Sequence, residues 1–105
     1  SIGQIPPEQE IVLFNIIHPN YVARAIRNYD HWTASEPERT EWNALDQVIR
    51  DVLVDFVYQG FTKGPNPMKA GMRNDKAEMI RYIENTPAIR QYEPGRNRAR
   101  YLRNN

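Results

Sequence analysis

The residues of this chain best suited to chemistry are arginines and tyrosines, and they are concentrated near its C-terminal end. Six arginines and three tyrosines lie between residues 81 and 103. Guanidinium groups neutralise phosphates, and a tyrosine ring offers a face on which any base can stack. We therefore predict nucleic-acid binding, to RNA rather than DNA. The predicted binding residues are Arg90, Arg96, Arg98, Arg100, Tyr101 and Arg103. The alternative is a solvated basic tail that binds nothing specific.

Arg27 and His31 form a second candidate pair. They are four residues apart, so on a helix both side chains would lie on one face. The all-helical HEPN ribonucleases use an Arg and a His separated by a short gap, but the gap of three residues here is shorter than in that family. A small helical RNase that uses Arg27 and His31 is therefore kept as an alternative function, and the chain is not assigned to that family.

Most other kinds of catalytic and cofactor site have no support in the sequence. The absence of cysteine excludes a thiolate zinc site and a cysteine nucleophile. The two histidines, His18 and His31, are 13 residues apart and have no partner at a metal-ligand spacing. The glycines form neither a dinucleotide-binding fingerprint nor a phosphate-binding loop. We expect no metal, no cofactor and no catalytic residues.

The charge of the chain is divided along its length. Residues 1–60 hold nine carboxylates and four arginines, a net charge of −5, and residues 61–105 hold ten Lys/Arg and four carboxylates, a net charge of +6. Opposite ends of this kind predict either an anionic partner or head-to-tail contact between copies, as in a coat or packaging protein. The simpler alternative is that the basic segment folds back onto the acidic half of its own chain.

The helices that must position these residues follow from apolar spacing and capping residues. We predict a first helix over about 6–17 and a second from Pro19 to about Trp32, with Val22, Ile26 and Tyr29 on its apolar side. The third predicted helix begins at a capping box of Ser35 and Glu38 and ends at Gly60. Its predicted apolar positions are Trp42, Leu45, Ile49, Val52 and Phe56, and its predicted exposed positions are Asp46, Gln47, Arg50, Asp51 and Asp55.

The second half of the chain is predicted to be less regular. Residues 60–74 contain three glycines and two prolines, which predict a long loop. Asp75 should cap a fourth helix, and Thr86-Pro87 should begin a short fifth helix that ends before Pro94-Gly95. The basic segment 96–105 is predicted to be extended or to form one or two helical turns.

Together these patterns predict one all-α domain over residues 1–105, with four or five helices, a long Gly/Pro loop over about 60–74 and a basic C-terminal segment. Our first hypothesis for function is a non-enzymatic nucleic-acid-binding structural or assembly protein. The second is a helical protein-interaction module, an adaptor or inhibitor, with no nucleic-acid role. No apolar run is long enough for a membrane span, so we expect an intracellular (cytoplasmic) or virion location and no membrane partner.

Overall fold

All regular secondary structure in residues 19–105, the part of the chain described by this computed structural model, is helical. The elements are α2 (Pro19–Thr33), the 3-10 helix η1 (Trp42–Ala44), α3 (Gln47–Tyr58), α4 (Asn66–Lys69), α5 (Lys76–Glu84), α6 (Pro87–Arg90), α7 (Glu93–Arg96) and α8 (Arg98–Asn104). The predicted all-α class is confirmed. The helix predicted over 6–17 lies outside the described residues. None of the described helices is long and apolar enough to cross a membrane.

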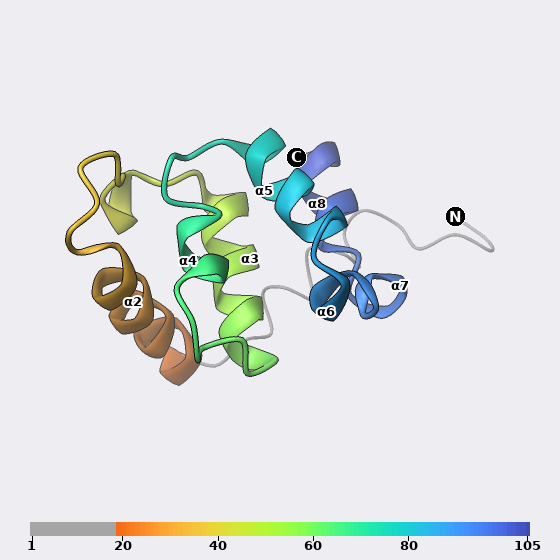
Figure 1. Ribbon diagram of the computed structural model, residues 1–105, viewed down its shortest axis with the longest axis horizontal. Helices are drawn as coiled ribbons and strands as arrows, with labels where there is room; N and C mark the ends of the chain where they lie inside the picture. Colours follow the sequence, from red (N-terminus) through yellow and green to blue (C-terminus); the bar gives the residue numbers. More distant parts are fainter. Residues whose placement is uncertain (1–18) are drawn as a thin grey trace.

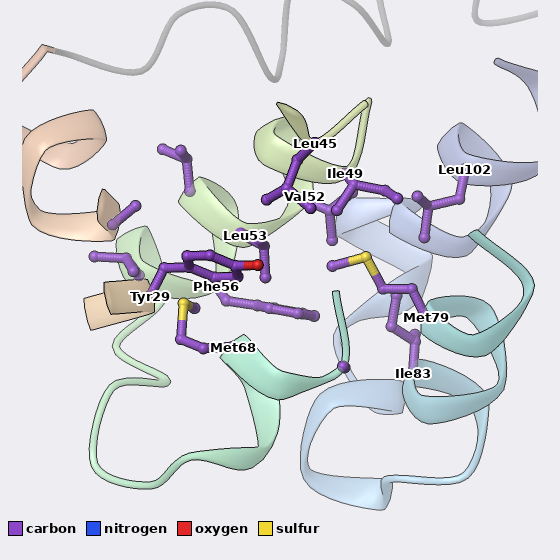
Figure 2. Packing of buried hydrophobic residues seen from close by; sticks show 14 of the residues in the cluster. Tyr29, Leu45, Ile49, Val52, Leu53, Phe56, Met68, Met79, Ile83 and Leu102 are labelled. Atoms are coloured by element: carbon purple, nitrogen blue, oxygen red, sulfur yellow. The ribbon is translucent and has the colours of Figure 1, made fainter. Parts of the chain in front are cut away.

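Helix α3 is the central element, and other helices pack on two sides of it (Figure 1). On one side lie α2 and α4, which supply Tyr29 and Met68 to the core (Figure 2). On the other side lie α5 and α8, which supply Met79, Ile83 and Leu102. All five side chains are at most 2% exposed. The hydrophobic core therefore extends on both sides of α3 and joins α2 and α4 to α5 and α8.

Helix α2 begins at Pro19 as predicted, but its buried face is rotated from the predicted one. Ala25, Tyr29 and Thr33 are fully buried, whereas Val22 is 37% exposed. The Tyr29 ring packs edge-on against Trp42, with the ring centroids 5.5 Å apart, and its hydroxyl donates to the Thr40 carbonyl. These two contacts orient α2 about its axis. They involve residues outside the helix, so the spacing of apolar residues within it cannot predict them.

The start of the third predicted helix was wrong, although its apolar positions are all buried. Residues 34–41 form turns, and Thr40 donates its backbone N–H to the Met72 carbonyl at 2.7 Å. Helix α3 begins only after Asp46, whose side chain accepts the Val48 N–H at 3.0 Å. The tertiary bond to Met72 thus takes this segment away from the helix that Ser35 and Glu38 suggested.

The end of α3 forms as predicted. Gly60 has φ +92°, its N–H bonds to the Val57 carbonyl at 3.0 Å, and the Phe61 N–H bonds to the Phe56 carbonyl at 2.9 Å. This pair of bonds is a Schellman motif, in which a left-handed residue ends the helix. The Phe56 and Phe61 rings provide the accompanying apolar contact, with centroids 6.3 Å apart.

The long loop predicted over about 60–74 contains an unpredicted short helix, α4, and a buried stretch that follows it. Met68, Ala70 and Met72 are at most 6% exposed and belong to the hydrophobic core. A Cβ at Gly71 would lie only 3.1 Å from Ile49 Cγ2. Glycine here allows the backbone to approach α3 closely, so the segment is part of the core rather than a linker.

The capping residues of the fourth predicted helix are confirmed, and the short fifth helix, α6, ends at Arg90, before Pro94-Gly95 as predicted. Asp75 accepts the backbone N–H groups of Ala77 at 2.9 Å and Glu78 at 3.2 Å, which begins α5. Pro94 lies inside the first turn of α7, where a missing N–H is tolerated. Residues 93–104 are therefore almost entirely helical, in the two short helices α7 and α8.

We expect Gly60→Ala to lower the free energy of unfolding by about 1 kcal/mol, because a left-handed conformation is costly for any residue with a Cβ. Urea unfolding followed by circular dichroism measures the change. Gly64→Ala is the matched control, since a Cβ there meets nothing within 4 Å, and it should stay within about 0.5 kcal/mol of the parent protein. Equal losses in the two variants would contradict the role of Gly60.

Candidate nucleic-acid interface

Two carboxylates of α3 that were predicted to be exposed are buried instead. Asp51 is 8% exposed and Asp55 is 0% exposed. Both accept hydrogen bonds from the C-terminal segment that carries the predicted binding residues. An ionised carboxylate that is removed from water must find such partners, because its desolvation is otherwise very costly.

Asp55 is bound by two arginines. Arg96 donates from Nε to Oδ2 of Asp55 at 3.2 Å and makes a second bond from Nη2 to Oδ1. Nη1 of Arg98 lies 3.5 Å from Oδ2 of Asp55. The Arg96 side chain is 27% exposed, and the Arg98 side chain is completely buried. These contacts tie α7 and α8 to the central helix.

Arg98 also connects the C-terminal helices to one another. Its Nε donates to Glu93 Oε2 at 2.7 Å and its Nη2 to the Ile89 carbonyl at 3.3 Å. Its guanidinium carbon lies 5.1 Å from the centroid of the Phe56 ring. Burial lowers the pKa of this guanidinium, and the hydrogen bond to Glu93 opposes that change. One buried side chain thus contacts α3, α6 and α7.

Tyr101 is held by the other buried carboxylate. Its hydroxyl donates to Asp51 Oδ2 at 2.6 Å, and Gln47 Nε2 donates to Asp51 Oδ1 at 2.7 Å. Burial is the main cause that raises the pKa of both Tyr101 and Asp51. Tyr101 is 4% exposed, so its ring faces the core and is not accessible to a base.

The junction between α7 and α8 is a sharp turn at Asn97. Asn97 has φ +54°, in the left-handed region that asparagine tolerates better than most residues. Glu93 Oε1 accepts the Ala99 N–H at 2.9 Å and so satisfies a free donor at the start of α8. At the other end of α8, Lys76 Nζ donates to the Asn105 carbonyl at 2.9 Å.

An open groove of about 620 Å³ lies among α5, α6, α7 and α8. It contains three of the six predicted binding residues, Arg90, Arg100 and Arg103, and its remaining lining residues are Glu84, Glu93, Pro94, Asn97 and Ala99. Arg103 Nη2 bonds to Glu84 Oε2 at 2.7 Å, and Arg90 Nη1 donates to the Glu84 carbonyl at 3.2 Å. We call this surface the arginine groove.

The structure therefore divides the predicted binding residues into two groups. Arg90, Arg100 and Arg103 are exposed and line the arginine groove, whereas Arg96, Arg98 and Tyr101 bind the carboxylates of α3. The sequence shows the same residue type at alternate positions from 96 to 100 and cannot distinguish these roles. No pattern in the sequence indicated that Glu84 and Glu93 belong to this surface. Their place in the groove follows from the bonds of Glu84 to Arg90 and Arg103 and of Glu93 to Arg98.

The carboxylates of the described part of the chain are all engaged internally. Each of the 11 side chains in residues 19–105 accepts a hydrogen bond or an ion pair from the same chain. Several cations form no ion pair with a described residue: Arg24, Arg27, Arg50, Lys63, Arg81 and Arg90. The described side chains therefore leave a surplus of positive charge for an outside partner.

The other candidate residues do not converge on a reactive centre. Arg27 and His31 are both exposed on α2, and the His31 ring lies edge-on to Trp32 with centroids 4.6 Å apart. Arg27 borders a shallow hollow whose other lining residues are Asn20, Tyr21, Ala23 and Arg24. Within residues 19–105, no three His, Asp or Glu side chains come together in a group that could hold a metal ion.

Comparison of the chain with protein-family models, curated proteins and solved structures finds no significant match.

We expect Asp55→Asn to lower the free energy of unfolding by about 1.5–3 kcal/mol, because Arg96 loses its charged partner and the buried Arg98 keeps only Glu93. Asp51→Asn makes the same chemical change about one helical turn earlier on α3 and is the matched control. An asparagine at 51 still accepts the Tyr101 hydroxyl and removes a buried charge, so the change should stay within about 1 kcal/mol. Urea unfolding of both variants checks the difference, and equal effects would contradict this role of Asp55.

Stability should also fall as the pH rises above about 10. Unfolded tyrosines lose their protons near pH 10, whereas burial raises the pKa of Tyr29 to about 12 and also raises that of Tyr101. Above pH 10 the folded state therefore binds more protons than the unfolded state, and stability that is present below pH 10 is lost. Urea unfolding at about pH 8 and about pH 11 measures this loss. Tyr101→Phe should reduce it, and an equal loss in this variant and in the parent protein would contradict the role of Tyr101.

Proposed function

We propose that this protein binds nucleic acid without catalysis, through the arginine groove. The observation that carries the proposal is the convergence of Arg90 from α6 with Arg100 and Arg103 from α8 on one open surface. Several guanidinium groups on one surface can contact successive phosphates of a backbone. Arginine suits this task because its planar donors can bind two oxygens of one phosphate.

The ion pair within the groove supports binding rather than prevents it. The Arg103 and Glu84 side chains are 53% and 46% exposed. An exposed pair of this kind contributes only about 0–1 kcal/mol, so Arg103 can exchange Glu84 for a phosphate at little cost. Glu93, the second carboxylate of the groove, is bound to Arg98 and to the N–H of Ala99, which reduces its repulsion of an anion.

The charge balance of the described residues favours an anionic partner over a basic one. Within residues 19–105 every carboxylate side chain accepts a hydrogen bond or an ion pair, whereas Arg24, Arg27, Lys63, Arg81 and Arg90 form no ion pair with a described residue. The same surplus of positive charge favours an anionic ligand over head-to-tail contact between copies. We therefore propose binding to nucleic acid without the coat- or packaging-like assembly that the charge division also suggested.

Fluorescence anisotropy with a labelled single-stranded RNA across a salt series tests the proposal. We expect binding at low salt and a linear fall of log affinity with log salt. Replacing Arg90 and Arg103 together by Gln should weaken binding and reduce the magnitude of the slope by about 1.4, since each phosphate contact on a single strand contributes about 0.7. Both side chains are exposed, so the variant should keep its fold.

The matched control replaces Arg24 and Arg27 of α2 by Gln, which removes the same charge from another surface. This variant should retain the affinity and nearly all of the slope. Equal weakening by the two double variants would overturn the assignment of the groove. Absence of RNA binding at low salt would overturn the function itself, and binding of an acidic peptide alone by the same groove would do so in favour of a protein-interaction module.

A further inference from the structure

Of the Phe, Trp and Tyr side chains in the described residues, only two are exposed. Tyr58, at the end of α3, is 51% exposed, and Tyr92, at the start of α7, is 48% exposed. The residue pattern predicted Tyr101 as the stacking residue instead, and the structure buries it. Neither Tyr58 nor Tyr92 belongs to the buried core, so both rings can contact a ligand.

Both exposed rings are held in place from the protein side. The Tyr92 ring packs against Phe61, with centroids 6.4 Å apart, and Phe61 in turn packs against Phe56 in the core. The Tyr58 ring contacts Tyr21 edge-on at 5.2 Å, and the guanidinium carbon of Arg96 lies 5.4 Å from its centroid. A ring that is already ordered loses little conformational entropy when a ligand stacks on it.

The tyrosines and the arginine groove share helix α7. Tyr92 precedes the helix directly, Glu93 and Pro94 within it line the groove, and its last residue, Arg96, lies over the Tyr58 ring. The helix is a single turn, only about 6 Å long. Tyr92 is therefore adjacent in sequence to the groove residues Glu93 and Pro94, and Arg96, which contacts the Tyr58 ring, follows them within the same turn.

We propose that Tyr92, together with the stacked pair of Tyr58 and Arg96, binds unpaired nucleobases, so that the ligand of this protein is a single strand. This inference rests on the proposed binding of phosphates in the arginine groove. Bases in a duplex are stacked on each other and do not offer their faces, whereas bases of a single strand can stack on tyrosine rings or on a guanidinium plane. Because every base has such a face, the contact is tolerant of sequence.

The test compares three probes of equal length with the full chain: a single-stranded RNA, an oligonucleotide without bases and an RNA duplex. The oligonucleotide without bases carries the phosphates alone and so reports on the groove alone. Stacking contributes about 1–3 kcal/mol per base, which corresponds to a roughly 5- to 150-fold tighter binding of the single strand than of the probe without bases. We expect the duplex to bind more weakly than the single strand.

Variants of Tyr92 distinguish stacking on the ring from a hydrogen bond made by its hydroxyl. Tyr92→Leu should remove most of the advantage of the single strand and leave binding of the probe without bases unchanged. Tyr92→Phe keeps the ring and loses only the hydroxyl, so it should retain the advantage. If Tyr92→Leu does not fold, quenching of a 2-aminopurine base in the RNA by the parent protein gives the same information, because stacking quenches its fluorescence.

The outcomes distinguish this inference from the proposed function. Equal affinity for the single strand and for the probe without bases, or for the single strand and the duplex, would overturn the stacking role and leave the groove intact. Failure of every probe to bind at low salt would overturn the proposed function and this inference with it. Loss of the advantage in both Tyr92→Leu and Tyr92→Phe would show a hydroxyl contact instead and would also overturn the stacking role.

Discussion

The buried carboxylate of Asp55 is the contact on which the C-terminal half of the structure depends. It lies in the last turn of α3 and is completely removed from solvent, so it must be neutralised from within the chain. Arg96 and Arg98 supply that charge, and Arg98 also reaches Glu93 and the Ile89 carbonyl. Once these bonds form, α6, α7 and α8 have fixed positions relative to α3, and the arginine groove is a consequence of where they lie.

This arrangement separates arginines that bind a buried carboxylate of α3 from arginines that line the arginine groove. Arg96 and Arg98 face the core side of the short helices, and Arg100 and Arg103 face the groove. A helical turn brings residues 98 and 100 to different sides of α8, so neighbouring arginines have opposite roles. The free energy that holds the domain together therefore comes partly from the same residue type that we propose binds phosphate.

Helix α7 brings the two proposed contact surfaces together. Its four residues are too few to be stable alone, and its position depends on Arg96 and Glu93, which bind Asp55 and Arg98. Because the groove and the exposed tyrosines both border this turn, their spacing is set by the buried charges and not by loops.

Local signals in the sequence were enough to predict several elements correctly. Asp75 as a cap, Gly60 as a left-handed terminator and the apolar positions of α3 depend on residues within a few positions of each other, so they can be recognised without tertiary contacts. The predicted start at Ser35 failed because Thr40 bonds to Met72, which is distant in sequence. No local rule contains that bond.

By itself, the sequence determined an all-helical chain with a surplus of arginine near its C-terminal end. Only the tertiary structure decided which arginines face solvent, that Tyr101 is buried, and that Tyr58 and Tyr92 are exposed. The physical reason is that an arginine has the same charge and length in both settings. Its role depends on whether a buried carboxylate such as Asp55 lies within reach, and that is fixed only when helices distant in sequence pack against each other.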